Sequence, residues 1–530
     1  MIQPRIFVPL YDPVYLQDMT ETQRLAIRNA ALRFRKYATT SVVVGWNPEC
    51  CMLLHPRRAC TANSQHHHEY TSHLMLQFTD VRQTTTISVL GSSHAAVGRL
   101  ATWLWSGPTK PSHVHIYGLM FDFSILSTDS LRNLAHCSSV RFTNCTMTAE
   151  QTALVASLLE NDKTIAFSDC KFADGGSAFL DALSSRDNSG GRLEIVPRQE
   201  SMRVELLDKP SLLRLFQQDF FLECLKVTSH LFRTHPNMLL MPFSAKTKME
   251  YTLYHADEAA WQQHTNGTDG LHIRPSDFHL IVHDAQQPEL THSEHANATA
   301  TDMVLPQLFF RACRHSKHLK KLGFSYHRSG GSTPVPLPQD IQTSLCQALD
   351  ANDGIQELTL DCGCTYDWKA ETKGPSLMNV LATHRGLRTL TLVVHQKSDP
   401  TLVTHLFSLL QLNRHFEVRF HKSSDSGFTP LVWEHQLRSI LVFNRFYRST
   451  LALCQWDPYR FHVWCAGIRR LQQKNHYRVY HLVQCEDQPT ASNHQSIRKM
   501  ALFLQHHTDL LCLLVNEVIQ DQSTDTHNIE

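Results

Sequence analysis

The densest group of side chains that could do chemistry lies between residues 50 and 73. Cysteine and histidine gather there, and both residue types can bind zinc. The members are Cys50, Cys51, His55, Cys60, His66, His67, His68 and His73. Zinc sites usually show ligand pairs spaced as C-x2-C or H-x3-H, and no such pair occurs here. His68-Glu69 is followed by His73, one residue too late for H-E-x-x-H. A solvated loop is therefore the favoured interpretation, with a metal site as the alternative.

Two shorter motifs resemble catalytic or redox motifs but differ from them in spacing. His292-Ser-Glu294-His295 is one residue shorter than the inverted zincin motif and lies in a polar segment. Cys362-Gly-Cys364 is a C-x-C motif that follows a predicted strand, so a turn explains it better than a redox pair. The sequence contains no phosphate loop, nucleophile elbow or dinucleotide fingerprint. It therefore predicts neither an enzyme nor a cofactor.

Length and composition indicate a folded protein that is too long for one ordinary core. The chain has 530 residues, of which 42% are hydrophobic and 19% charged, and its formal net charge is +1. A chain of this length divides into domains or extends as repeats. The balanced charge argues against nucleic acid as the partner, because it provides no overall field to attract polyanions.

The sequence also predicts the compartment. No apolar run approaches the ~20 residues that a membrane span needs. The first residues contain Pro4, Arg5 and Pro9 and do not form the apolar core of a secretory signal. The 15 cysteines are scattered and odd in number. We therefore expect reduced thiols in a cytoplasmic or nuclear protein.

One short pattern recurs along the chain: two apolar residues separated by one, then a Cys, His or similar residue three positions later. The clear copies span Cys137–Met147, Ile165–Phe172, Leu222–Phe232 and Leu387–His395. Weaker copies begin at Ile87, Val114, Leu193, Tyr251, Leu280, Leu322, Leu358 and Val418. From Ile87 to Leu193, successive copies lie about 25 to 28 residues apart. Spacing in this range is typical of a structural repeat.

Between the copies, the apolar period changes from two residues to about 3.6, which predicts a helix after each strand. The segments with this helical pattern are Ala149–Leu159, Ser177–Leu183, Ser376–Ala382 and Leu402–Leu412. Within a strand, Val140 and Phe142 should point into the core while Arg141 and Thr143 alternate outward. One such unit cannot bury its apolar face alone, but stacked units form a continuous core.

On these copies, the chain resembles the leucine-rich-repeat family, closest to its ribonuclease-inhibitor-like subtype with longer helices. The resemblance covers roughly Ile87 to His421, with four good and eight degenerate copies. It implies an α/β solenoid, a horseshoe with a parallel concave sheet and outer helices.

The sequence also predicts how the chain divides into regions. Residues 1–86 fit an N-terminal cap with a helix at Thr20–Tyr37 and strands at Val42–Val44 and Leu74–Phe78. Residues 87–425 form the predicted solenoid, with loop insertions near 284–302 and 329–338. Residues 426–520 predict a helical C-terminal cap or domain, because their apolar residues recur at helical spacing, and 521–530 predict a disordered tail. The helices expected in the C-terminal region span Trp433–Tyr447, Tyr459–Gln473 and Ile497–Ile519.

A solenoid presents the outward residues of successive strands as one extended surface. The favoured function is therefore a non-catalytic scaffold that binds another protein on the concave face. The candidate partner-binding residues are His113, His115, Tyr117, Arg141, Thr143, Arg192, Glu194, Lys321, Glu357, Asp361, Arg419 and His421.

Within this set, four residues form a predicted basic block, with Glu194 as the only acid close by. The block consists of His113, His115, Arg141 and Arg192. An acidic segment of the partner would gain charge-assisted hydrogen bonds there, strongest from the arginines. Binding should tighten as the pH falls from about 7.5 to 6, where histidine gains charge. The competing hypothesis places the contact on aromatic residues of the C-terminal region, 426–519.

Two other functions remain open. The first is a substrate-recognition subunit of a ubiquitin ligase, because some leucine-rich-repeat proteins pair the solenoid with an adaptor-binding helical motif. Leu337-Pro-Gln-Asp340-Ile341 superficially resembles the opening of an F-box helix, but it lies where the repeat already requires a helix. The least favoured function is a metal-dependent hydrolase that uses the 50–73 cluster.

Metal analysis separates the hydrolase from the two binding functions. We expect the purified full-length protein to contain no stoichiometric transition metal, because the 50–73 cluster lacks paired ligands at the usual spacing. Inductively coupled plasma mass spectrometry provides the measurement. One zinc ion per chain that disappears in a Cys60→Ser variant would support the hydrolase instead.

Overall fold

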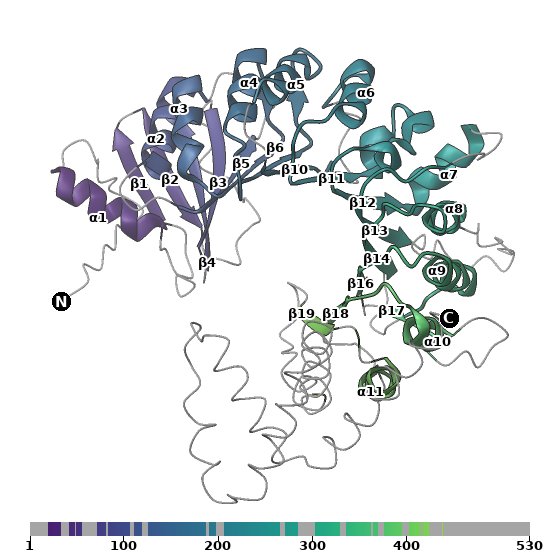
Figure 1. Cartoon of the computed structure of the whole chain (residues 1–530). Coiled ribbons are helices and arrows are strands. Elements are labelled where there is room, and N and C mark those ends of the chain that lie inside the picture. Colours follow the sequence, from purple (N-terminus) through teal and green to yellow (C-terminus); the bar gives the residue numbers. More distant parts are fainter. Residues whose placement is uncertain are drawn as a thin grey trace, which may run out of the picture. The chain divides into compact units, whose positions relative to one another are not determined.

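The computed structural model describes two compact units, Met1–Tyr366 (unit 1) and Asp367–Glu530 (unit 2). The residues that it describes are 20–32, 42–47, 49–55, 72–80, 83–106, 111–118, 126–186, 190–197, 206–264, 271–284, 303–328, 335–361, 364–368, 376–394, 402–413, 415, 417–422 and 437. Unit 1 is an α/β structure built on one large, mostly parallel sheet (Figure 1). No helix in the described part of the chain combines the length and the apolar character needed to cross a bilayer.

The sheet of unit 1 begins with four antiparallel strands. They are β1 (Val42–Asn47), β2 (Cys50–His55), β3 (Ser72–Asp80) and β4 (Gln83–Gly91), in the spatial order β1-β2-β4-β3. The weak copy at Ile87 lies in β4, which pairs antiparallel with β2 and β3 and does not belong to the parallel series. β3 is inserted between β4 and the first parallel strand and runs antiparallel to both. Alternating apolar residues occur in both kinds of strand, so the pattern cannot predict this order.

The remaining strands of this sheet run parallel, each paired in register with the next. They are β5 (His113–Gly118), β6 (Ser139–Thr143), β8 (Thr164–Ser168), β10 (Arg192–Ile195), β11 (Cys224–Thr228), β12 (Met249–Tyr254), β13 (Asp277–Asp284), β14 (Lys321–Arg328) and β16 (Glu357–Asp361). Val140 pairs with Val114 on one side and with Ile165 on the other, and Leu193 pairs with Ile165 and Leu225. The predicted alignment of these five copies in one parallel sheet is therefore confirmed.

Helices connect the parallel strands and lie along one face of the sheet (Figure 1). The helices of unit 1 are α1 (Glu21–Leu32), α2 (His94–Ser106), α3 (Thr128–Arg132), α4 (Ala149–Ser157), α5 (Ser177–Ser184), α6 (Lys209–Gln217), α7 (His255–His264), α8 (Val304–Cys313) and α9 (Gln339–Ala351). Short 3-10 turns supplement them at Asn133–His136, Ser229–Phe232, Pro236–Met238 and Met241–Ser244. Within unit 1, no described helix or strand lies over the opposite face, which we call the open face.

The core of unit 1 lies between the sheet and these helices. Val140 and Phe142 are each 1% exposed and Arg141 is exposed, as the alternation predicts. Phe142 stacks on Phe167 of the next strand, with ring centroids 5.6 Å apart, and Phe167 meets Phe179 of α5 edge-on. Aromatic pairs of this kind add to the stabilisation from buried area.

Local sequence signals fix where several helices begin. Thr148 and Gln151 form a capping box that opens α4. Asp208 accepts the backbone N–H of Ser211 at the start of α6. The start of α8 depends on a more distant residue, because the buried carboxylate of Glu258 in α7 accepts the N–H groups of Val304 and Leu305, both at 2.6 Å. An anion there also interacts favourably with the helix dipole.

The described residues test the predicted insertions and turns in part. Val335–Pro336 (β15), inside the insertion expected at 329–338, pairs with Cys364–Thr365 (β17) in a small separate sheet. A second small sheet joins β7 (Thr146–Met147) to β9 (Lys171–Phe172). Residues 285–302 and 329–334 lie outside the described residues, as do 362–363 of the C-x-C motif.

Unit 2 repeats the alternation of helix and strand. Its elements are α10 (Leu377–Thr383), β18 (Thr389–Val394), α11 (Leu402–Leu412) and β19 (Glu417–Lys422). β18 and β19 pair in parallel with Leu390 opposite Val418, so the copies at Leu387 and Val418 also form strands. Apart from Leu437, the C-terminal helices and the tail predicted from residue 426 onward lie outside the described residues.

The core positions give the first test of the fold. We expect Phe142→Ala and Phe167→Ala each to lower the free energy of unfolding by about 3–5 kcal/mol, because each removes a fully buried ring. Urea denaturation of the full chain provides the measurement. Phe221→Ala is the control, because Phe221 is 59% exposed and its loss should cost less than about 1 kcal/mol. A core variant as mild as this control would show that its ring does not fill the core.

Candidate functional site

The open face of unit 1 is organised in rows, because in-register strands place equivalent outward residues side by side. The central row runs through His115, Arg141, Ala166, Glu194, Lys226, Glu250, His279, Gly323 and Thr359. Each outward position of a strand contributes to such a row. The surface is therefore set by the register of the sheet and not by individual loops.

An ion-pair network occupies the middle of this row. Arg141 lies 3.2 Å from Glu194, although the strand β8 separates them, and the intervening Ala166 is too short to block the contact. Arg192 contacts Glu194 at 2.9 Å and Glu250 at 2.5 Å, and the second contact again passes over a strand. Lys226 also contacts Glu250 at 2.5 Å. Burial raises the pKa of Glu250, but the positive charges of Lys226 and Arg192 together lower the pKa by more. The pKa of Glu250 therefore lies below its usual value.

This network changes the expectation of a free basic block. Glu194 is not the only acid near Arg141 and Arg192, because Glu250 reaches Arg192 from β12. Both arginines are held in ion pairs, so their charge is largely matched within the face. His113 is exposed and stands beside the Ser112 hydroxyl, with Oγ and Nδ1 2.8 Å apart.

Three of the candidate contact residues are buried. Thr143 is 0% exposed, and its hydroxyl lies 2.8 Å from Nε2 of His115. Glu194 is held between its two arginines. Asp361 is 5% exposed. The side chains of these three residues are therefore little exposed, and their role as contact residues stays a prediction.

The other candidates lie where the register predicts. Tyr117 stacks on His115 with centroids 3.7 Å apart and donates its hydroxyl to Gln77 of β3 at 3.3 Å. Lys321 and Glu357 form an exposed ion pair of 2.8 Å between β14 and β16. The remaining two, Arg419 and His421, belong to β19 of unit 2, where Arg419 contacts Glu417 at 3.1 Å.

A second row lies at the carboxyl ends of the strands and was missed by the sequence analysis as a group. His230, Tyr254, His283 and His327, which we call the ring row, follow one another across β11 to β14. Their successive ring centroids are 3.9, 4.9 and 5.0 Å apart. Each ring follows the second apolar residue of its strand by three positions, aligned on Val227, Tyr251, Leu280 and Phe324. The same position holds Cys145 and Cys170 in the earlier copies, so the repeat pattern contained the signal.

Carboxylates stand at both ends of the ring row. Asp257 of α7 lies 2.6 Å from Nδ1 of His230 and accepts hydrogen bonds from Ser229 at 2.5 Å and Arg233 at 2.9 Å. Burial raises the pKa of Asp257, but the bonds from His230 and Ser229 outweigh it and leave the pKa below its usual value. At the other end, Asp361 lies 3.7 Å from Nε2 of His327.

The central rings of this group are held neutral. Burial, together with the neighbouring imidazoles of His327 and His230, lowers the pKa of His283 to about 4. Burial also lowers the pKa of His279, which lies four residues before His283 on the same strand. The Nε2 atom of His279 is 2.9 Å from the Ser325 hydroxyl. At neutral pH the imidazole of His283 is therefore uncharged and can both donate and accept hydrogen bonds.

The polar groups beside the ring row hydrogen-bond to one another. The Ser229 hydroxyl donates to Asp257 and accepts the N–H of Tyr254, so it is committed to structure. No three His, Cys, Asp or Glu side chains among the described residues converge as metal ligands. Cys51 of β2 and His73 of β3 lie on either side of Leu90 in β4. Cys60 and His66–His68 lie outside the described residues, so the 50–73 cluster is described only in part.

The chain matches neither a protein-family model nor any curated protein. The function of the open face is therefore argued from its own geometry.

The ring row predicts a specific pH dependence of stability. Free histidine titrates near pH 6.5, so the unfolded state takes up protons below that pH while His283 resists until about 4. The contribution of His283 to the free energy of unfolding should be fully present above pH 6.5 and should be lost as the pH decreases toward 4. We expect His283→Phe, which keeps the stacked ring, to lose less stability over this range than the unmodified protein.

Thermal unfolding measured at several pH values between 4.5 and 7.5 provides the test. His113→Phe, which replaces an exposed histidine, is the matched control and should keep the full pH dependence. Identical slopes for the unmodified protein and His283→Phe would show that His283 is not held neutral by its neighbours.

Proposed function

We propose that the chain is a leucine-rich-repeat solenoid that acts as a non-catalytic scaffold and binds another protein across the open face, the concave face of such a solenoid. The observation that supports this most directly is the set of in-register outward rows from β5 to β16, over which no described element of unit 1 lies. Alternating strands and helices with all described crossover helices on one face support the solenoid assignment.

The electrostatics of the face indicate what kind of partner it suits. Arg141, Arg192 and Lys226 are matched by Glu194 and Glu250, so the face holds fixed charges of both signs in defined positions. Side chains that are already held lose little conformational freedom on binding. A partner with charges of both signs can extend this network, and such complementarity provides specificity more than affinity.

The ring row adds a neutral region beside the charged one. The half-buried ring of His283 offers hydrogen bonds without a charge to desolvate. A binding surface with a neutral aromatic region and a charged region is typical of protein recognition sites. The ubiquitin-ligase alternative is not favoured by a specific contact, and the segment Leu337–Ile341 leads into α9, which connects β14 to β16.

A pair of matched charge reversals tests the binding face. We expect Arg141→Glu combined with His115→Glu to reduce capture of a partner at least about tenfold, because it places new negative charge beside Glu194 on the open face. Arg132→Glu is the control, since Arg132 also forms an ion pair, with Asp129 at 2.6 Å, but lies on the helix α3. Quantitative affinity capture and mass spectrometry of both variants provide the measurement.

Folding of the variants is checked by their unfolding midpoints. Equal recovery of every partner by the open-face variant, in a folded protein, would remove this face from consideration. Loss of the same partner from the Arg132→Glu variant alone would place the contact on the helical face.

A further inference from the structure

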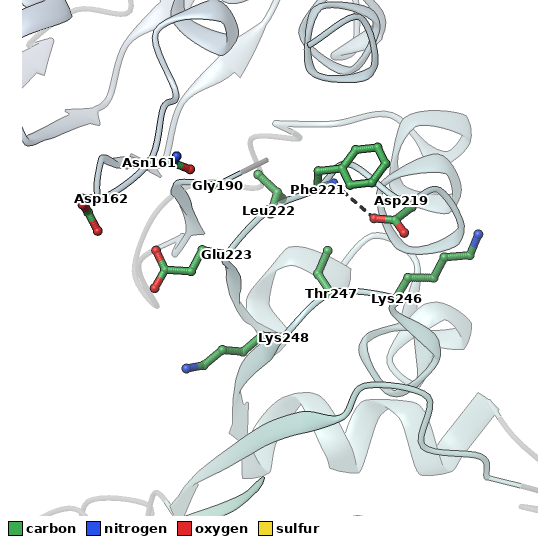
Figure 2. A pocket seen from close by; sticks show the side chains of 10 residues that line it. All are labelled: Asn161, Asp162, Gly190, Asp219, Phe221, Leu222, Glu223, Lys246, Thr247 and Lys248. Atoms are coloured by element: carbon green, nitrogen blue, oxygen red, sulfur yellow. Dashed lines mark hydrogen bonds between the residues drawn. The ribbon is translucent and has the colours of Figure 1, made fainter. Parts of the chain in front are cut away.

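A shallow pocket of about 660 Å³ lies at the amino ends of β8, β10, β11 and β12, away from the ring row (Figure 2). Loops that precede four successive parallel strands form it, starting with the loop that contains Asp162 and ending with the loop that contains Lys248. A volume in this range, about 300–1,000 Å³, is typical of ligand sites. The open-face function does not use this pocket.

An exposed aromatic side chain marks one end of the pocket. Phe221 is 59% exposed, whereas its neighbours Phe220 and Leu222 are 2% and 8% exposed. Its backbone has φ +51°, a conformation that costs energy for a bulky residue. The Gly190 N–H donates to the Phe221 carbonyl at 2.7 Å, and the Phe221 N–H donates to Asp219 Oδ1 at 3.2 Å. The fold therefore fixes a strained backbone that displays an aromatic ring to solvent.

The charged groups of the pocket are unequal in number. Asp162, Asp219 and Glu223 supply three exposed carboxylates. The ammonium of Lys248 lies 3.1 Å from Asp277 and is matched there, outside the lining. Lys246 is the remaining cation of the lining, and the described residues provide it with no ion pair. Figure 2 shows Asp219 beside Phe221 at one end of the pocket, with Glu223 and Asp162 at the other.

We propose that this pocket binds a basic segment of a partner protein, with an arginine side chain on the ring of Phe221. The guanidinium stacks on the ring face and donates hydrogen bonds to Asp219. A second basic residue of the same segment meets Glu223 and Asp162. Arginine suits the first position better than lysine, because its planar group can stack and donate in parallel.

Anionic partners fit the pocket less well. A phosphate or an acidic peptide would have to approach three carboxylates with one uncommitted lysine to offset them. A purely apolar side chain would use Phe221 but would desolvate the carboxylates without pairing them. A cation satisfies both the ring and the carboxylates.

The test uses the full-length protein and a fluorescein-labelled peptide with two arginines in a glycine–serine background. Fluorescence anisotropy gives the dissociation constant. We expect Phe221→Ala and Asp219→Asn each to weaken binding at least about fivefold, and Phe221→Leu to weaken it similarly because it keeps bulk without a ring. Lys246→Ala should tighten binding, since it removes a like charge.

Two controls separate the pocket from general attraction to an acidic surface. Phe407→Ala replaces another exposed phenylalanine, 38% exposed on α11, and should leave the dissociation constant unchanged. The same peptide with glutamine in place of arginine should not bind. Unchanged binding in both Phe221 variants, or a glutamate peptide that binds more tightly than the arginine peptide, would overturn the proposal. Open-face variants such as Arg141→Glu should leave the dissociation constant of this peptide unchanged. The experiment therefore tests the pocket separately from the proposed binding function of the open face.

Discussion

In-register pairing of parallel strands is the constraint on which the rest of unit 1 depends. Because Val140 pairs with both Val114 and Ile165, every inward side chain meets its equivalents on both neighbours. Phe142 and Phe167 stack for this reason, and the helices can cover one continuous apolar face. The same register brings outward residues into rows, so core and surface are set by one geometric rule.

On the open face, the size of each side chain decides which neighbours in its row can contact one another. Ala166 lets Arg141 reach Glu194, and Gly323 leaves room for the ring of His279, where a Cβ would lie 2.5 Å from the ring. Small residues in the central row thus allow long neighbours to extend over them. At the carboxyl ends, where β12 to β14 are longer than β6 and β8, rings replace the cysteines that follow β6 and β8 and form a stack.

Sequence patterns predicted the strands well because inward positions such as Val140 and Leu193 must be apolar. They could not predict strand order, and β3 lies between β4 and β5 although Ile87 and Val114 keep the repeat spacing. Glu250 was missed because 58 residues separate it from Arg192, and only the register brings them together. Phe221 follows another phenylalanine and precedes a leucine, so its sequence suggests a core position, and only the backbone conformation reveals the exposed ring.

The ion pairs that pass over a strand also bear on cooperativity. In stacked repeats, each unit contacts its immediate neighbours, so stability propagates one step at a time. Arg141 and Glu194 connect β6 to β10 over β8, and Arg192 and Glu250 connect β10 to β12 over β11. These contacts couple each strand to its second neighbour. They therefore favour joint opening of the strands from β6 to β12, because separating β6 from β10, or β10 from β12, also breaks an ion pair.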